Sequence, residues 1–598
     1  MKKSPLFVLT SLLSVSVLSL AMAMESRNPL PQANNPNTQT NQGGRNTNNP
    51  ANVNPNPVLE AADENANNRT SPTRRITRQN QPPRNNVGSS GEQRSFDGSG
   101  NNENNTEWGA SHTRLERVVD VDYADGISAL AGSDRASARE ISNKVSSQTD
   151  SIPNTQNASD FLWQWGQFID HDIDLTDGTD PTEFANIAVP AGDPLFDPNT
   201  TGTEVISFNR SIYDADSGTS SDNPRQQLNE ISAWLDGSNV YGSNTERANA
   251  LRTLDGSGQL KTSEGDLLPF NMDGFSNAGG DSNRLFLAGD VRANEQVGLT
   301  TLHTLFVREH NRLALKIATE QATLSGEEIY QLARKLVGAE IQIITYREYL
   351  PALLGRNALR PYRGYRDNVN PNISNLFSTA AYRYGHSALS PTLLRLNADG
   401  SESSFGHLSL REAFFSPQRL TTEGGIEPVL RGLANQVCQA IDPFIIDDVR
   451  NFLFGNPAQG GFDLVALNIQ RGRDHGLPSY NATRLALGLS AATNFSDISA
   501  DSTIQTRLAD AYQSVDDIDV WVGGLAEDRI NGGMVGELIS AVLIQQFEAL
   551  RDGDRFWYEN TLTPAENRLM GRSRLANIIR RNTDIGNEIN NNVFRVTN

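Results

Sequence analysis

Cysteine is nearly absent from this chain of 598 residues, where Cys438 is the only one. A single cysteine excludes an intramolecular disulfide framework and any cysteine-rich metal or iron–sulfur site. Histidine is also scarce, with seven in all, so chemistry that depends on imidazole has few positions to use. Basic residues are outnumbered, since 51 Lys and Arg face 71 Asp and Glu for a formal net charge of −20. This balance argues against nucleic acid as a partner.

Long apolar runs are missing except at the N-terminus. There Lys2 and Lys3 precede an apolar run from Pro5 to Leu20, followed by Ala21-Met22-Ala23. This order predicts a signal peptide over residues 1–23. The run is short for a membrane-spanning helix and no later segment is long enough, so we expect no transmembrane segment. The sequence therefore predicts export, either to the extracellular space or to the periplasm.

Aromatic residues are absent from residues 24–94, which are rich in Asn, Pro, Gln, Arg, Ser and Thr. Such a segment cannot bury enough apolar surface to offset its ordering entropy, so we predict a disordered linker. Residues 95–598 have a globular composition with no second linker, which favours one large domain. Apolar residues recur at helical spacing over 298–318, 326–349 and 534–551, and strand-like alternation is scarce, so the fold is predicted to be mainly α.

Acidic and apolar residues are densely mixed in SDFLWQWGQFIDHDIDLT, residues 159–176. Ser159 suits an N-cap and the apolar residues fit a helical stripe. In that helix Gln167, Asp170 and His171 share one side, and Asp172 points elsewhere. Taken alone, the stretch is more typical of a hydrogen-bonded structural histidine on a partly exposed helix than of a catalytic one.

Oxygen ligands alternate in SAWLDGS, residues 232–238. Ser232, Asp236 and Ser238, together with the Trp234 carbonyl, suit a hard cation such as calcium, and Asp172 could complete the shell. The same residues are also ordinary turn chemistry.

Three further stretches carry polar residues that could act together. Arg292 and Glu295 occur in AGDVRANEQ, where a surface ion pair is the alternative. His386, in AYRYGHSAL, could ligate a metal if its other ring nitrogen were held. Asn468, in ALNIQRGRDHG, could accept a hydrogen bond from such a histidine, although a polar loop held by Arg–Asp pairs has the same composition.

In this order and spacing, the five stretches closely resemble the animal haem peroxidase family of the peroxidase–cyclooxygenase superfamily. The resemblance runs from residues 95–109 to 552–560 and beyond. It implies a single, mainly α haem peroxidase domain, with haem between distal and proximal helices and few short strands. It also implies an enzyme that reduces hydrogen peroxide through Compound I and then oxidises a halide, thiocyanate or a phenolic donor. The signal peptide together with the lack of disulfides favours a secreted member of bacterial type.

Carried over residue by residue, the resemblance implies a role for each candidate. His171 matches the distal catalytic histidine, Gln167 the distal glutamine and Arg292 the distal arginine. His386 matches the proximal ligand of the haem iron, and Asn468 its hydrogen-bond partner. The other matches are Asp170 and Glu295 (ester bonds to haem b), Arg383 and Arg471 (near the haem propionates), and Asp172, Ser232, Trp234, Asp236 and Ser238 (calcium).

Two departures bear on activity. Gln296 stands where some mammalian members have a methionine that bonds to haem, so that bond is absent and chloride oxidation is not expected. The fatty-acid dioxygenases of the superfamily carry a radical tyrosine in a Tyr-x-x-His context. Tyr382 lies four residues before His386 and Tyr384 two before, which disfavours that alternative. A decayed adhesion or matrix protein is the third alternative, and the intact set of site residues argues against it.

Overall fold

The structure is a computed structural model that describes residues 92–457 and 459–597. The predicted signal peptide and nearly all of the predicted linker lie outside the described residues. Glu92 and Arg94, which we assigned to the end of the linker, contact the folded chain. Glu92 forms an ion pair with Arg555 (2.6 Å), and Arg94 forms one with Asp554 (2.5 Å). Ordered contacts therefore begin before residue 95.

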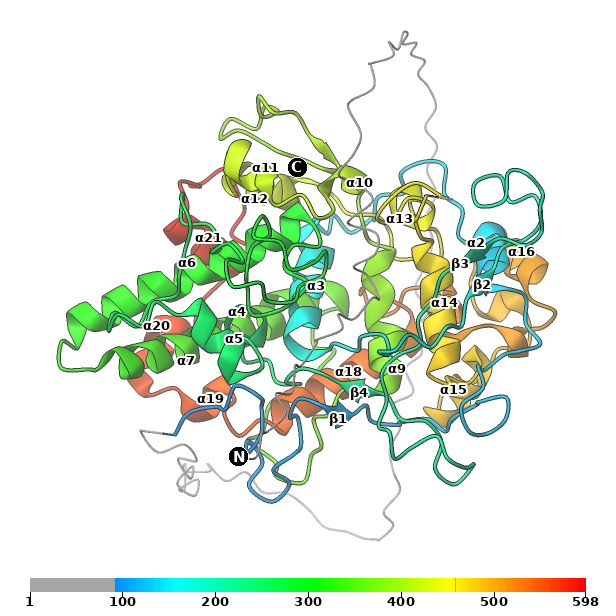
Figure 1. The fold of residues 1–598 in the computed structure, drawn as a ribbon, viewed down its shortest axis with the longest axis horizontal. Helices are drawn as coiled ribbons and strands as arrows, with labels where there is room; N and C mark the ends of the chain where they lie inside the picture. Colours follow the sequence, from blue (N-terminus) through cyan, green and yellow to red (C-terminus); the bar gives the residue numbers. More distant parts are fainter. Residues whose placement is uncertain (1–91, 458, 598) are drawn as a thin grey trace, which may run out of the picture. The chain divides into compact units, whose positions relative to one another are not determined.

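Helices are the main regular structure of the described residues and are joined by long loops (Figure 1), which confirms the predicted mainly α fold. The longer ones are α2 (Ala138–Val145), α3 (Phe161–Ile173), α6 (Val297–Glu320), α7 (Gly326–Ile344), α12 (Glu427–Asn435), α14 (Leu464–Asp474), α16 (Ser502–Ala511), α18 (Glu537–Asp552) and α21 (Leu575–Asn582). The shorter ones are α4 (Ser238–Tyr241), α5 (Thr245–Leu251), α8 (Leu350–Leu353), α9 (Asn375–Thr379), α10 (Leu410–Ala413), α11 (Gln418–Thr422), α13 (Asp447–Arg450), α15 (Tyr480–Ala486), α17 (Val520–Ala526), α19 (Tyr558–Thr561) and α20 (Pro564–Met570).

The strands of the described residues form three antiparallel pairs, each strand being two residues long. They are β1 (Thr113–Arg114) with β4 (Leu228–Asn229), β2 (Ile187–Ala188) with β3 (Val205–Ile206), and β5 (Thr392–Leu393) with β6 (Leu408–Ser409). Two residues are too few to show alternation, which explains why strand-like alternation is scarce along the chain.

The apolar stripes of 298–318 and 326–349 form α6 and α7, which pack side by side (Figure 1). Ser325 and Glu328 make a reciprocal capping box that fixes the start of α7. The predicted end differs, because the last turn, Thr345–Tyr349, is π-helical. This wider turn carries Tyr349, whose hydroxyl lies near Gly166 of α3.

Helix α3 is buried in the core and is held at its start by the C-terminal segment. The prediction that Ser159 is the N-cap of α3 is wrong. The Ser159 hydroxyl donates to the carbonyl of Val593, and Asp160 takes the cap position. The backbone amide of Ser159 also donates to the Phe594 carbonyl (3.1 Å), and the Phe594 ring packs edge-on against Trp165. Residues far apart in sequence therefore fix where α3 begins.

Asp160 is a buried carboxylate whose ionisation opposes folding. Its Oδ1 accepts from Trp163 Nε1 (3.0 Å) and Ser390 Oγ (2.7 Å), while its Oδ2 is buried with no partner in the described chain. Burial raises the pKa of Asp160 to about 7, despite these two hydrogen bonds. The native state thus holds its proton between pH 4 and 7 where the unfolded chain does not, so stability is lost as pH rises through that window.

We expect Asp160→Asn to be more stable than the parent at pH 8, by up to about 4 kcal/mol, and close to it at pH 4. The amide keeps an oxygen for both donors and carries no charge at either pH. Denaturant unfolding at the two pH values measures the difference, with the exposed Asp120→Asn as control. An equal effect of Asp160→Asn at both pH values would contradict the assignment.

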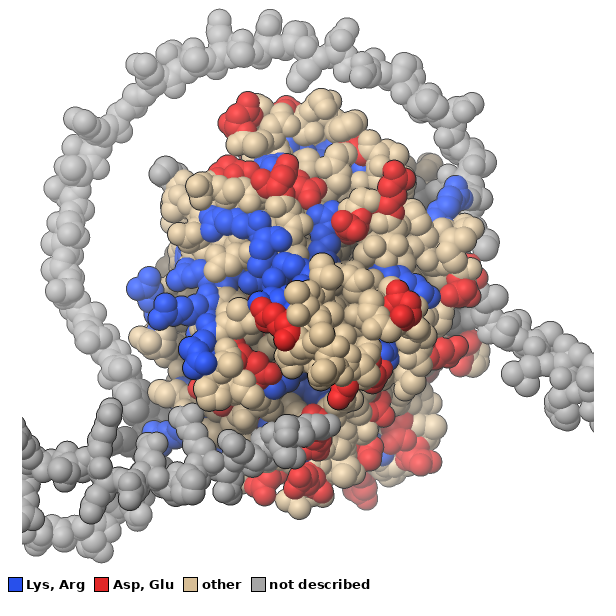
Figure 2. Space-filling model, turned by 90° about the vertical axis from the view of Figure 1, so that its left-hand side faces the viewer, with Lys and Arg blue, Asp and Glu red and all other residues tan. Residues whose placement is uncertain are grey.

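The surface charge is not uniform despite the acidic total. On the face shown in Figure 2, Lys and Arg side chains gather in a connected group, with acidic side chains around and below it. Exposed arginines follow one another around α20, at Arg568, Arg572 and Arg574. No helix among the described residues has the length and apolar character that crossing a membrane requires.

Candidate active site

Helix α3 and the loop before α6 bring the predicted distal residues together. Arg292 Nη1 lies 3.5 Å from Asp170 Oδ2, and its Nη2 donates to the Asp174 carbonyl (2.8 Å). His171 Nε2 lies 4.0 Å from Glu295 Oε2. The four predicted residues Asp170, His171, Arg292 and Glu295 therefore form one cluster.

Gln167 joins this cluster through the start of α6. Gln296 is the N-cap of α6, where its side-chain oxygen accepts from the Gly298 amide (2.7 Å). The amide nitrogen of Gln296 donates to Gln167 Oε1 (3.1 Å), which leaves the Gln167 nitrogen free to donate toward Glu295. Gln296 thus orients the predicted distal glutamine.

The electrostatics of the cluster keep the imidazole neutral. Burial and then the charge of Arg292 hold the pKa of His171 well below its ordinary value. Burial raises the pKa of Asp170 to about 7, an effect that Arg292 only partly offsets, and burial likewise raises the pKa of Glu295 to about 7. At neutral pH His171 therefore offers a nitrogen lone pair beside a permanent cation.

The predicted proximal residues come from two other elements. His386 ends the 3₁₀ helix η3 (Ala381–His386), which packs against α3, and Asn468 lies on α14. Asn468 Nδ2 lies 2.7 Å from His386 Nδ1, so the predicted pair is present. The direction differs from our prediction, because the amide oxygen of Asn468 accepts from Arg383 Nη1 (3.3 Å) and the amide nitrogen therefore faces the imidazole.

The side chains of both groups border internal space. Asp170 and Glu295 behave as buried acids, yet 32% and 24% of their side-chain surfaces are accessible. Burial lowers the pKa of His386 to about 3 although its surface is partly accessible as well. Next to it, a Cβ placed on Gly385 would meet no atom within 4 Å. Accessible surface on groups surrounded by protein is what the lining of a cofactor cavity shows, so these residues fit a bound haem.

The two arginines predicted near the propionates, Arg383 and Arg471, donate hydrogen bonds to groups of the protein itself. Arg383 Nε donates to the Ser378 carbonyl (2.9 Å), and Arg471 Nη1 donates to Ser211 Oγ (2.7 Å) and Asp474 Oδ2 (3.2 Å). Arg383 has no carboxylate within ion-pair distance in the described chain. Asp174, to which we assigned no role, ends α3 buried, and its Oδ1 has no hydrogen-bond partner in the described chain.

The predicted calcium residues also converge. Ser238 Oγ donates to the Asp172 carbonyl (2.8 Å), and the Ser238 amide donates to Asp236 Oδ1 (3.0 Å). Ser232 Oγ lies 3.5 Å from Asp236 Oδ2, and the Trp234 carbonyl accepts from the Asp236 amide (2.9 Å). Gly237 has φ of 81°, a left-handed backbone that favours glycine.

This loop places two fully buried carboxylates together. Burial and then the charge of Asp236 raise the pKa of Asp172 to about 8, and burial also raises the pKa of Asp236. Because like charges in a buried site oppose ionisation, a bound cation would relieve the cost. Carboxylate, hydroxyl and carbonyl oxygens are the ligands that calcium prefers, so the loop fits that ion.

Two features of the site escaped sequence analysis. Asp290, two residues before Arg292, binds that guanidinium with both carboxylate oxygens. Three buried tyrosines are also linked, since Tyr349 donates to Tyr382 (3.1 Å) and shares a 2.5 Å hydrogen bond with Tyr384. The tyrosine hydroxyls lie so close to α3 that a side chain at Gly166 would clash, since a Cβ there would lie 3.0 Å from the Tyr349 hydroxyl.

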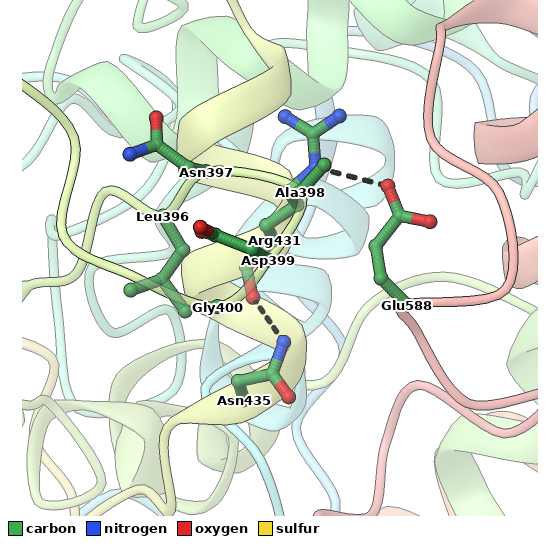
Figure 3. Close-up of a pocket in the computed structure, with 8 residues that line it drawn as sticks. All are labelled: Leu396, Asn397, Ala398, Asp399, Gly400, Arg431, Asn435 and Glu588. Atoms are coloured by element: carbon green, nitrogen blue, oxygen red, sulfur yellow. Dashed lines mark hydrogen bonds and ion pairs between the residues drawn. The ribbon is translucent and has the colours of Figure 1, made fainter.

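A separate hollow of about 260 Å³ contains none of the predicted site residues. It lies between residues 396–400, α12 and Glu588 (Figure 3). Its one cationic side chain, Arg431, pairs with Glu588 (3.1 Å) and Asp584 (2.7 Å). Because that cation is paired and the hollow contains none of the predicted site residues, the candidate site remains the cluster around α3.

Comparison with known families agrees with this geometry. The family model described as "Animal haem peroxidase" matches residues 93–594. This chain belongs to the animal haem peroxidase family. Among curated members of that family, peroxinectin A of Dictyostelium discoideum is 37% identical over 85% of this chain and 97% of its own length. Peroxidasin of Drosophila melanogaster is 36% identical over 78% of this chain, and thyroid peroxidase of Sus scrofa is 39% identical over 81%. This chain spans 34% and 58% of those two longer proteins.

Solved structures confirm the haem peroxidase fold. Peroxidase A from Dictyostelium discoideum superimposes with a TM-score of 0.78 at 36% identity, covering 85% of this chain and all of that one. A fatty acid alpha-dioxygenase of Arabidopsis thaliana has a TM-score of 0.72 at 21% identity, covering 84% of this chain and 83% of that one. At that identity the second likeness concerns the fold alone.

Proposed function

We propose that this protein is a haem peroxidase that reduces hydrogen peroxide with electrons from small donors. The observation that carries the proposal is the distal cluster, where neutral His171 lies beside cationic Arg292 and accessible interior acids. Helix η3 packs against the same helix α3 and presents His386, with one ring nitrogen held by Asn468. A base, a fixed cation and an axial nitrogen ligand are what peroxide chemistry at haem requires.

In this proposal His386 would hold the haem iron through Nε2, because Asn468 contacts its Nδ1. A neutral imidazole that binds metal through Nε2 carries its proton on Nδ1. In that tautomer the Asn468 side chain would present its amide oxygen to His386 and accept a hydrogen bond from Nδ1–H. Haem supplies the redox centre at which the peroxide O–O bond breaks.

The distal residues move the protons. His171 Nε2 takes the proton from the first peroxide oxygen and returns it to the second, which leaves as water. Arg292 stabilises the negative charge that develops on the departing oxygen. Gln167, with its carbonyl held by Gln296, offers an N–H donor beside the same space.

The absorption spectrum of the purified, haem-supplied protein tests this function. A Soret band that changes on addition of one equivalent of hydrogen peroxide is expected. The absence of a Soret band would overturn the proposal. Oxygen uptake with a fatty acid and no peroxide would favour a dioxygenase instead.

Asp170 and Glu295 are proposed to bond covalently to haem. Both carboxyls face internal space, and burial raises the pKa of each to about 7. After turnover with peroxide, we expect haem to remain with the chain through acidified organic solvent. The double variant Asp170→Asn, Glu295→Gln should release it, and complete release from the parent protein would refute the bonds.

The donor is proposed to be a phenol, bromide, iodide or thiocyanate. An aromatic cluster supports access by aromatic donors, since the ring of Phe454 lies 5.1 Å from both Phe414 and Phe415. The Phe415 amide donates to the Glu295 carbonyl (3.1 Å), which places the cluster beside the site. Phe415 and Phe454 hold left-handed backbones, a strained state for bulky residues that clusters at functional sites.

Calcium at Asp172, Ser232, Trp234, Asp236 and Ser238 is proposed as a second resident group. Asp172 directly follows His171, so an ion held there pins the end of α3 that carries the distal imidazole.

Export of the protein is proposed from the sequence of residues 1–23 alone.

A further inference from the structure

Asp290 is a buried carboxylate whose two oxygens are both used by Arg292. Its Oδ1 accepts from the backbone amide of Arg292 (2.8 Å) and from Nε (2.9 Å), and its Oδ2 accepts from Nη2 (2.9 Å). Only 1% of the Asp290 side chain is exposed. Two parallel bonds to a carboxylate fix the plane of a guanidinium as well as its position.

The imidazole of His171 meets the same carboxylate. His171 Nδ1 lies 3.5 Å from Asp290 Oδ1, slightly beyond a well-formed hydrogen bond. Nδ1 is buried and has no hydrogen-bond partner among the described residues, so Asp290 is the acceptor within reach. The other ring nitrogen, Nε2, faces Glu295 at 4.0 Å. The two nitrogens of His171 thus have different neighbours.

The charges around this pair favour a carboxylate at Asp290. Burial alone would raise the pKa of Asp290, but the charge of Arg292 and the hydrogen bonds that Arg292 donates hold it well below its ordinary value. His303 is the other ionisable ring nearby, and burial lowers its pKa to about 4, so it stays neutral. The backbone amide of Asp290 donates to the Asn239 carbonyl (3.0 Å), which anchors the residue from the other side.

We propose that Asp290 is a positioning residue that orients both distal groups, because it holds the Arg292 guanidinium by two hydrogen bonds and accepts a hydrogen bond from Nδ1–H of His171. This selects the tautomer in which Nε2 is bare and faces the acids of the cavity. The inference rests on the proposed peroxidase function. Asp290 touches neither peroxide nor haem and acts only through its two neighbours.

The peroxide step needs that arrangement more than the donor step does. His171 can take a proton at Nε2 only if the ring proton is on Nδ1. Without Asp290, the ring is free to hold its proton on either nitrogen, and Arg292 keeps only its bonds to Asp174 and Asp170. Removing Asp290 therefore slows proton transfer from peroxide and leaves electron transfer from donors unchanged.

The test compares Asp290→Ala and Asp290→Asn with a matched control, all supplied with haem. Asp193→Asn is the control, because Asp193 is equally buried and binds Arg139 through both oxygens, at 2.8 and 3.2 Å. Three quantities are measured: haem content, kcat/KM for peroxide and for donor separately, and the association rate of cyanide with the ferric protein. Cyanide binds as hydrogen cyanide and must leave its proton on a distal base, so its rate reports the state of His171 without turnover.

For Asp290→Ala we expect about a 10²-fold loss in both cyanide association and kcat/KM for peroxide, with haem content and kcat/KM for donor unchanged. Asp290→Asn should lie between the alanine variant and the parent, because its amide oxygen can still accept from Nδ1. If the alanine variant does not fold, the asparagine variant alone carries the test.

Two outcomes would overturn the inference. One is a parent-like cyanide rate and peroxide kcat/KM in the Asp290 variants. The other is an equal loss of haem and donor kcat/KM, shared by Asp193→Asn, which would make Asp290 merely structural. A parent protein that binds haem but does not react with peroxide would instead count against the proposed function.

Discussion

Peroxide reduction by the haem-loaded His171→Ala variant is expected to fall by about 10²- to 10⁴-fold, with haem still bound. The buried imidazole is neutral, and alanine removes the nitrogen that moves the peroxide proton. Arg292 keeps its two bonds to Asp290 in this variant, so the loss reports the base and not the cation. Stopped-flow absorption of the ferric protein mixed with peroxide measures the rate.

The control for this variant is His407→Ala. His407 is partly exposed, 3.9 Å from Glu402, and belongs to a different part of the chain. The His407→Ala variant should react with peroxide at the parent rate. His386→Ala should instead alter the spectrum of the resting iron before any peroxide is added. A His171→Ala variant that reacts with peroxide as fast as the parent would show that another group is the base.

Calcium is expected to stabilise the parent protein by about 2.7 kcal/mol at a free concentration of 100 times its Kd, and to leave Asp236→Ala unaffected. Asp172 and Asp236 are buried side by side, so the ion relieves a repulsion that the protein alone cannot. The measurement is the denaturant or thermal midpoint with added calcium and after chelation.

A second variant separates a specific site from general effects of calcium on an acidic protein. Asp125 accepts from the amides of Ile127, Ser128 and Ala129 in an exposed turn, so Asp125→Asn should keep the full calcium response. An equal response in Asp236→Ala and the parent would refute the site. Because Asp172 adjoins His171, chelation should also slow cyanide association.

Periodicity was sufficient to predict the long helices. The stripes that became α6 and α18 run over four or more turns, so one face stays apolar throughout. It could not predict the π-helical turn at Thr345–Tyr349 or the break between α9 and η3, where the chain leaves the α-helix at Ala380. Those departures depend on contacts between segments, which a local pattern does not contain.

The candidate site could be assembled because five stretches, in order, resemble those of a known family, and the resemblance implied the role of each residue. Asp290 was missed for a physical reason, since an acid two residues before an arginine is commonly a solvated pair and only burial gives it a different meaning. The Asn468 amide was predicted in the opposite orientation, because Arg383 competes for its oxygen. Such choices are decided by which donor reaches an acceptor in three dimensions.

The hydrogen bonds from Ser159 to the carbonyls of Val593 and Phe594, which fix the start of α3, have a consequence for biosynthesis. Both histidines of the site are translated more than two hundred residues before these anchors, yet the distal helix has no fixed beginning until they arrive. Domains tend to fold as units during synthesis, with earlier segments first. Here a nascent chain would carry both histidines on the ribosome without a finished distal wall, and cofactor capture would have to wait until residues 593 and 594 have been made and have docked.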